Sequence, residues 1–276
     1  MDIVTSVTAL RERLQREPNN VFVPTMGNLH EGHINLIGIA KPKATCTVVS
    51  IFVNRLQFGP KEDFERYPRT FQSDCDKLRN SGVDVVFAPD EREIYPEPQT
   101  FVVEPSDLQH ILDGAFRPGH FRGVATVVLK LFNMVMPHAA IFGKKDYQQY
   151  LVLRDMVRQF ALRVEIIPAE TVRAADGLAL SSRNGYLAPN ERAEAPRLYA
   201  LLQDAQQRLT AGERNFQRIE LESMALLSRN GWTPQYIAVR RRADLQVPSA
   251  SDRELVVLAA AYLGKTRLID NIEVTL

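Results

Sequence analysis

The sequence predicts an α/β fold in which a Rossmann-like, doubly wound parallel sheet is followed by a smaller α+β domain. Through the first two thirds of the chain, short Val- and Ile-rich runs alternate with stretches of helical periodicity. The apolar runs are continuous, which is typical of strands covered by helices on both faces of a parallel sheet. From about Asp176 onward this alternation stops. We therefore expect domains at residues 1–175 and 176–276.

The individual elements follow from the same patterns. Apolar runs predict strands at 21–23, 46–53, 83–88, 139–142 and 164–167. Amphipathic stretches predict helices at 32–41, 70–81, 121–136 and 146–161. In the third of these helices, one apolar face contains Val124, Val127, Val128, Leu131, Phe132 and Val135. The second domain is expected to contain helical segments near 189–211 and 215–229, then strands at 236–239, 255–261 and 267–269.

Composition excludes several classes of function. The 276 residues include 34 Lys and Arg against 33 Asp and Glu, a net charge of +1, which argues against nucleic-acid or membrane-surface binding. The first residues do not resemble a signal peptide, and the longest apolar run, Leu255–Leu263, is too short to span a bilayer. Cys46 and Cys75 lack metal or redox spacing, as expected in a reducing cytosol. We expect a cytoplasmic protein.

A histidine pair after the first predicted strand is the most informative local feature. His30 and His33 lie three residues apart at the predicted start of a helix, with Gly27 and Gly32 nearby. This spacing places both imidazoles on one face of the first turn, beside backbone N–H groups and the positive end of the helix dipole. Such a site suits a polyphosphate whose negative charge grows as a phosphate leaves. The alternative is a pair of ordinary histidines near a turn.

Two further polar segments follow predicted strands. Asn54 and Gln57 offer uncharged donors and acceptors that suit hydroxyl or carboxylate recognition in a partly apolar pocket, although an ordinary polar loop is the better explanation of this segment alone. The segment 142–149 contains a glycine, two lysines and Asp146 at a helix start, which can hold phosphate and ribose. In its alternative interpretation, Asp146 is only an N-cap and the lysines are solvated.

Other loops have two interpretations each. Ser181, Ser182 and Arg183 follow a Gly-containing turn and resemble a mobile phosphate clamp, although serine-rich loops are commonly simple connectors. The segments 66–69 and 119–123 either line the site or shape loops around it.

Taken together, these segments resemble the pantothenate synthetases, or pantoate–β-alanine ligases. The shared motifs run in order through nearly the whole chain: PTMGNLHEGH at 24–33, VSIFVN and LQF across 49–58, YPRT at 67–70, FAP and EIYP across 87–96, RPGHFRGVATVV at 117–128, FGKKDYQQ at 142–149, DGLALSSRNGYL at 176–187 and TRLIDN at 266–271. The HxGH motif alone is less specific, because nucleotidylyltransferases and class I aminoacyl-tRNA synthetases also use it.

The resemblance implies a two-step reaction. Pantoate attacks the α-phosphate of ATP, with Mg²⁺ present, to form pantoyl adenylate and pyrophosphate, and β-alanine then displaces AMP. His30, His33, Lys145 and Arg183 are the implied catalytic residues, and Gln57 and Gln149 the implied pantoate ligands. The implied ATP-binding residues are Met26, Gly27, Asn28, Leu29, His30, Glu31, Gly32, His33, Gly143, Lys144, Lys145, Asp146, Val172, Leu180, Ser181, Ser182 and Arg183.

The resemblance also implies a homodimer formed through the first domain. The metal ligands are not identified, and Asp74 is only a weak candidate. Two positions depart from the family pattern: Arg55 replaces a common proline, and Lys144 replaces a common acidic residue and adds positive charge near the nucleotide. The alternatives are a nucleotidylyltransferase acting on a phosphorylated acceptor, which would need more Arg and Lys near Asn54 and Gln57, and a non-catalytic nucleotide-binding module.

Overall fold

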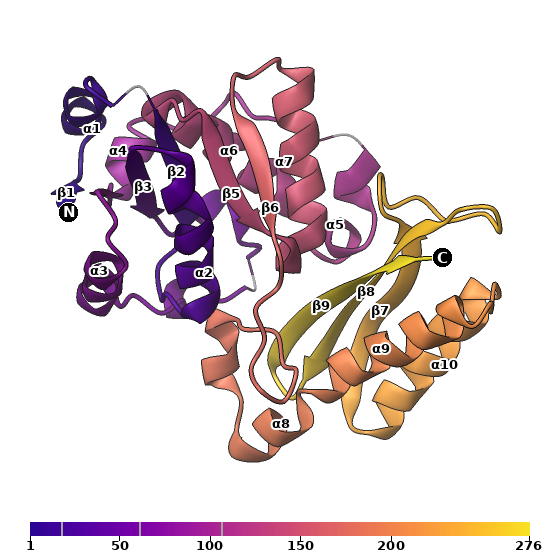
Figure 1. Cartoon of the computed structure of the whole chain (residues 1–276). Coiled ribbons are helices and arrows are strands. Elements are labelled where there is room, and N and C mark those ends of the chain that lie inside the picture. The colour runs from indigo at the N-terminus through magenta and orange to yellow at the C-terminus, as the bar shows by residue number, and fades with distance from the viewer. Residues whose placement is uncertain (18, 61, 106) are drawn as a thin grey trace. The chain divides into compact units, whose positions relative to one another are not determined.

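The structure is a computed structural model that describes residues 1–17, 19–60, 62–105 and 107–276 (Figure 1). It divides into two compact units. The first contains Met1–Lys144 and Val152–Glu170, and the second contains Lys145–Leu151 and Thr171–Leu276. The functional roles expected for residues 1–175 and 176–276 remain a prediction.

The first unit contains a parallel sheet, which confirms the predicted fold class. Among the described residues its strand order is β1-β4-β3-β2-β5-β6, and every pair is parallel. The strands are β1 (Asp2–Val4), β2 (Asn20–Thr25), β3 (Cys46–Ile51), β4 (Val85–Phe87), β5 (Ala139–Gly143) and β6 (Glu165–Ala169). The five predicted strands are present. Sequence analysis missed β1, because a three-residue edge strand carries too little apolar pattern to detect.

Helices cover both faces of this sheet. The first unit's described helices of eight or more residues are α1 (Val7–Leu14), α2 (Glu31–Ala40), α3 (Phe71–Asn80) and α6 (His120–Val135), and its shorter ones are α4 (Glu91–Ile94), α5 (Asp113–Phe116) and the 3-10 turns η1 (Lys41–Lys43), η2 (Arg55–Gln57), η3 (Phe64–Arg66) and η4 (Asp107–His110). The 3-10 turn η5 (Lys144–Asp146) and the helix α7 (Tyr147–Gln159) have residues in both units. On one face, Val21 and Val49 share a core with Ile37 of α2 and Leu78 of α3. On the opposite face, Phe22 and Phe142 contact Phe132 of α6 edge-on. Within the described part of the chain, no helix has the length and apolarity needed to cross a membrane.

The order of the strands locates the most suitable edge for a ligand. The chain passes from β2 to β3 and β4 on one side, then returns through α6 to β5 on the other side of β2. In open parallel sheets, ligands bind at the carboxyl ends of the strands where the order reverses in this way. The turn that carries His30 and His33, residues 26–33 and called the histidine turn below, follows β2. Gly143 ends β5 and Lys144 follows it, and β5 pairs with β2 through Val21–Ala139 and Phe22–Ala140. Both segments therefore leave the sheet at its carboxyl edge.

The second unit, beyond Thr171, is an antiparallel sheet covered by helices. Its strands are β7 (Trp232–Arg241), β8 (Glu254–Leu263) and β9 (Thr266–Thr275), in the order β7-β8-β9, and its helical segments are η6 (Ser182–Tyr186), α8 (Pro189–Glu194), α9 (Arg197–Thr210) and α10 (Phe216–Arg229). Leu202, Ile219 and Val257 belong to one buried core. The predicted 189–211 segment is two helices, because Pro196 cannot donate the backbone hydrogen bond that would continue the first.

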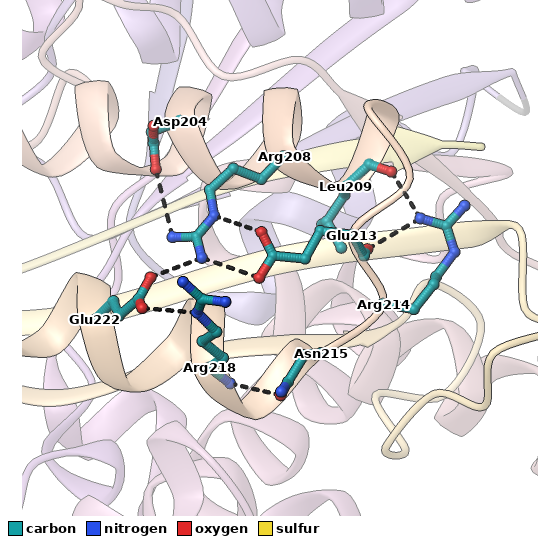
Figure 2. Close-up of polar contacts among 8 residues, drawn as sticks. All are labelled: Asp204, Arg208, Leu209, Glu213, Arg214, Asn215, Arg218 and Glu222. Carbon is teal, nitrogen blue, oxygen red and sulfur yellow. Dashed lines mark hydrogen bonds and ion pairs between the residues drawn. The ribbon is translucent and has the colours of Figure 1, made fainter.

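An ion-pair network connects α9 and α10 (Figure 2). The Arg208 guanidinium donates to both carboxylate oxygens of Glu213, at 2.9 and 3.0 Å, and to Glu222 at 2.7 Å. Asp204 lies 3.8 Å away, and Arg218 donates a separate hydrogen bond to Glu222 at 2.8 Å. Arg208 is therefore the cation shared by three carboxylates.

We expect Arg208→Met to lower the thermal unfolding midpoint more than Arg218→Met does. Arg208 lies within ion-pair distance of three carboxylates, whereas among the described residues Arg218 forms an ion pair with one, Glu222. Because these groups are close to solvent, salt should screen them and reduce the difference. Calorimetric melting of both variants at low and high salt tests this. Equal losses for the two variants at low salt would contradict the central role of Arg208.

Candidate active site

The turn after β2 presents both histidines at the start of α2. Gly27 and Asn28 have left-handed backbone angles, with φ of 83° and 51°, which reverses the chain. His30 then caps the helix, its Nδ1 accepting a hydrogen bond from the Gly32 N–H at 3.1 Å, and the His33 Nδ1 accepts from the His30 N–H at 3.3 Å. In the neutral form of each ring, the proton is therefore on Nε2. The ring centroids are 4.2 Å apart, so the structure brings the two predicted residues together.

A buried carboxylate from α3 holds this turn. Asp74 is 0% exposed, and its two oxygens accept hydrogen bonds from the backbone N–H groups of Asn28 and Leu29, both at 2.8 Å. Thr70 Oγ1 also donates to Asp74 at 3.0 Å, and Lys77 Nζ donates to the Leu29 carbonyl at 2.6 Å. Among the described residues, no group of three or more His, Cys, Asp or Glu side chains could hold a metal ion. Asp74, the weak metal candidate, braces the histidine turn.

Gln57 lies in η2, in the loop that follows β3, and contacts Met26 of the histidine turn. Its Nε2 is 3.2 Å from Met26 Sδ, and its Oε1 accepts a hydrogen bond from Asn54 Nδ2 at 3.1 Å. Asn54 is buried, donates to the Gly123 carbonyl at 3.2 Å and accepts from the Tyr95 hydroxyl at 2.7 Å. Asn54 therefore orients the Gln57 amide. The departure at Arg55 is accommodated by pairing with Glu91 and by stacking on Phe64.

A second buried group holds the backbone of Gln57. His120, at the start of α6, bonds through Nδ1 to the Gln57 carbonyl at 2.8 Å and through Nε2 to Arg117 Nη1 at 2.9 Å. Because a guanidinium only donates, Nε2 accepts and the Nδ1–H donates. Glu62 in turn accepts two hydrogen bonds from Arg117, at 2.6 and 2.8 Å. Of the two interpretations of 119–123, these contacts favour support of the loop that carries Gln57.

This chain of contacts has clear electrostatic consequences. Burial, together with the Arg117 charge, lowers the pKa of His120 from 6.5 to about 4. Burial by itself would raise the pKa of Glu62, but the Arg117 hydrogen bonds and charge outweigh it and lower that pKa to about 2. At neutral pH the three linked groups are therefore the Glu62 carboxylate, the Arg117 guanidinium and the neutral His120 imidazole.

The segment after β5 contributes residues to each unit separately. In the first unit, Lys144 Nζ lies 2.6 Å from Glu170 Oε1, so the extra positive charge at this position is paired. In the second, Lys145 is half-buried, and its backbone carbonyl accepts a hydrogen bond from Asn271 Nδ2 at 2.9 Å. Asp146 is exposed and Gln149 is half-buried.

The predicted clamp residues follow a short hairpin in the second unit. The Leu180 N–H donates to the Val172 carbonyl at 2.9 Å, and the Ala174 N–H donates to the Leu178 carbonyl at 2.8 Å. Ser181 then caps η6, its Oγ accepting from the Arg183 N–H at 3.3 Å. The hairpin therefore joins Val172 to the segment that carries Ser181, Ser182 and Arg183. Whether this segment moves when nucleotide binds remains a prediction.

Sequence reasoning singled out Asp74 as a weak metal candidate and 119–123 as a segment that lines the site or shapes loops, but it missed the contacts by which buried polar groups hold these turns. Asp74, His120, Arg173, Asp270 and Asn271 contact backbone or charged groups around the predicted site residues. Asp74 lies among mainly polar residues of α3 and carries no burial signal in the sequence, whereas Asp270 is a polar residue that follows Leu268 and Ile269 within a strand. Such a residue marks a buried polar contact without naming its partner.

The fold and this site define a class of enzyme that uses an α/β sheet with an HxGH turn at its carboxyl edge. A profile of the pantoate–β-alanine ligase family matches residues 2–273. The chain is 54% identical over 275 residues to the pantothenate synthetase of Nitrosospira multiformis, covering 100% of this chain and 99% of that protein. The structure also matches the crystal structure of the Thermus thermophilus pantothenate synthetase, with a TM-score of 0.95, 42% identity and full coverage of both chains.

A third relative carries ligands. The Francisella tularensis pantoate–β-alanine ligase, crystallised with β,γ-ATP and β-alanine, matches with a TM-score of 0.84 and 35% identity over 99% of this chain and 97% of that one. The chain belongs to the pantoate–β-alanine ligase family. It is accordingly an enzyme of pantothenate biosynthesis.

The pH dependence of stability tests the environment of His120. The folded-state pKa of His120, about 4, lies below the ordinary 6.5. Its contribution to the free energy of unfolding is therefore fully present above pH 6.5 and is lost as the pH falls toward 4. We expect about 3 kcal/mol of unfolding free energy to be lost over this interval through His120. His120→Gln should flatten the profile, whereas the exposed His110→Gln should not. Denaturant titrations at several pH values measure this, and parallel wild-type and His120→Gln profiles would contradict it.

Proposed function

We propose that this ligase works through a pantoyl adenylate. A carboxylate oxygen of pantoate attacks the α-phosphorus of ATP, the bond to the β-phosphate oxygen breaks, and pyrophosphate leaves with the electron pair. The amine of β-alanine then attacks the acyl carbon, the bond to the AMP oxygen breaks, and the nitrogen loses a proton. The products are pantothenate, AMP and pyrophosphate.

In the first unit, we assign the triphosphate to the turn from Met26 to His33. The helix start provides backbone N–H groups and a positive dipole end, and the Nε2–H of each imidazole is the donor of its ring. These donors can stabilise the charge that develops on the departing pyrophosphate, with His33 in the proton-donating role. The observation that carries this proposal is the pair of hydrogen bonds from the Asn28 and Leu29 backbone N–H groups to Asp74, because these bonds hold the turn in one conformation.

In the second unit, we assign positive charge to Lys145 and Arg183. A carboxylate that attacks a polyanion needs charge neutralisation and orientation more than it needs an acid–base pair. Ser181, Ser182 and Leu180 would bind phosphates beside Arg183, Val172 would contact the nucleotide through its backbone, and Asp146 would bind ribose. Closure of this segment would keep water from the mixed anhydride.

Pantoate recognition is assigned to Gln57 and Gln149. An amide offers a donor and an acceptor together, which suits the hydroxyl and carboxylate groups of pantoate. The Gln57 amide is oriented by Asn54 and its backbone by His120, so it is prepared for one ligand geometry. β-Alanine would lie near Gln57 in the second step. The Francisella tularensis relative in complex with β,γ-ATP and β-alanine supports the choice of these substrates.

Mg²⁺ would enter bound to the ATP phosphates. Mg²⁺ is commonly held by substrate phosphates and water with few protein ligands, and the described residues contain no protein metal cluster. Both oxygens of Asp74 already accept backbone hydrogen bonds, so they do not fit a metal site. We further propose a cytoplasmic homodimer in which residues 1–175 bind ATP and pantoate and residues 176–276 act as a lid.

AMP and pyrophosphate release should require pantoate, and turnover beyond one equivalent should also require β-alanine. This follows from an adenylate that stays bound until an amine attacks it. Quenched-flow assays with labelled ATP, with and without each substrate, measure the products. Release of ADP and phosphate would show acyl-phosphate chemistry instead, and transfer of AMP to a phosphorylated acceptor would favour a nucleotidylyltransferase.

Gln57→Ala and Lys145→Met should have separable effects. Gln57→Ala should weaken pantoate binding and leave ATP affinity nearly unchanged. The reason is that polar groups of bound pantoate would lose their hydrogen-bond partner in a buried pocket. Lys145→Met should slow adenylate formation roughly 10²–10³-fold, as expected for the loss of one electrostatic donor. Calorimetric titrations with each substrate, with single-turnover rates, distinguish the two. Loss of ATP affinity with normal pantoate affinity in Gln57→Ala would reverse its assignment.

A further inference from the structure

Two adjacent polar residues are buried in the middle of β9. Asp270 is 4% exposed and Asn271 is 7% exposed, within a strand that contributes Leu268 and Val274 to the apolar core of the second unit. Burial of polar groups is costly unless they form hydrogen bonds. The partners of this pair come from two segments that are far away in the sequence, and both segments carry residues assigned to the nucleotide.

Asp270 pairs with Arg173, which lies in the hairpin of residues 172–180 that precedes Ser181. Its oxygens accept from Arg173 Nη1 at 2.6 Å and from Arg173 Nη2 at 2.8 Å. The same guanidinium donates to the Gly177 carbonyl at 3.1 Å and to the Asn271 carbonyl at 3.2 Å, and it lies 3.5 Å from the centre of the Tyr199 ring. Arg173 therefore links both ends of the turn of residues 173–177, which precedes Ser181, to β9.

Asn271 binds the other segment. Its Nδ2 donates to the Lys145 carbonyl at 2.9 Å, while its backbone N–H donates to Asp270 Oδ1 at 2.8 Å. The Lys145 peptide lies in the 3-10 turn η5, where a side-chain donor fixes a carbonyl that no sheet ladder holds. The orientation of this peptide determines where the Lys145 side chain begins.

We propose that Asp270 and Asn271 are positioning residues for the nucleotide: Asn271 acts through Lys145, and Asp270 acts through Arg173 on the hairpin that carries Ser181–Arg183. This inference rests on the proposed function, in which Lys145 and Arg183 bind the phosphates. A buried ion pair adds little net stability compared with apolar residues of the same volume, so its distinctive contribution here is geometric. A displacement of about 1 Å at a reacting centre can cost about 10²-fold in rate.

The first experiment tests whether Asn271 acts through Lys145. Asn271→Ala should weaken ATP binding and slow AMP formation, each about tenfold or more, with pantoate binding unchanged. Asn271→Asp, which keeps the shape but replaces the donor, should do the same. In a Lys145→Met background, Asn271→Ala should have no additional effect. The control is Asn230→Ala, which also removes an amide-to-carbonyl hydrogen bond, from Asn230 Nδ2 to the Leu226 carbonyl at 2.8 Å at the end of α10.

The second experiment tests the Asp270 contact. Asp270→Asn and Arg173→Lys should increase hydrogen exchange at the Ala174 and Leu180 amides, which close the hairpin. Exchange in α10 should remain at the wild-type level. ATP affinity should fall together with this local protection, and Arg173→Lys, which keeps a cation, should lose less than Arg173→Ala.

The outcomes separate this inference from the proposed function. If the wild type forms no AMP from ATP and pantoate, the adenylate mechanism fails, while the calorimetric comparison of ATP binding still tests the positioning role. The positioning role is overturned if Asn271→Ala and Asn271→Asp bind ATP as the wild type does. It is also overturned if Asn271→Ala lowers affinity equally with and without Lys145, or if Asn230→Ala produces the same loss.

Discussion

The site in the first unit depends on one interaction, in which the backbone N–H groups of Asn28 and Leu29 donate hydrogen bonds to the buried Asp74 carboxylate. These amides lie between β2 and α2, where neither the sheet ladder nor the helix provides an acceptor. Gly27 and Asn28 adopt left-handed backbone angles there, and a Cβ added at Gly27 would lie only 3.1 Å from Asp74 Oδ2. The carboxylate therefore determines where α2 begins, and α2 determines where both imidazoles lie.

The same arrangement recurs around the other candidate residues. His120 holds the Gln57 carbonyl, Asn271 holds the Lys145 carbonyl, and Arg173 holds the Gly177 carbonyl. In the first two cases a buried polar side chain from another element replaces the hydrogen bond that a regular ladder would provide. In the third, Arg173 lies in the same hairpin as Gly177, and the buried Asp270 of β9 holds its guanidinium. Charged groups stabilise these contacts in turn, as in the pair between Glu62 and Arg117. Turns positioned in this way can present side chains to a ligand with a defined geometry.

Much of the architecture could be predicted from local pattern. Five parallel strands and the apolar face of α6 follow from periodicity, because continuous apolar runs and the i, i+3, i+4 repeat report burial directly. The prediction was poorer where the pattern was short or mixed. β1 has only three residues, and β7, β8 and β9 extend beyond their apolar centres because charged residues such as Arg240 and Glu254 occupy strand positions. An antiparallel sheet tolerates these residues, since one of its faces can contact solvent.

The sequence by itself determined the fold class, the family resemblance and the identity of the candidate residues, because apolar periodicity and motif spacing are local properties of the chain. Only the tertiary structure decided what Asp74, His120 and Asn271 do. Their partners lie 45, 63 and 126 positions away along the chain. A buried polar side chain must find a hydrogen-bond partner, but its own segment does not specify which one. The folded backbone decides that, by bringing the donor and the acceptor within reach of each other.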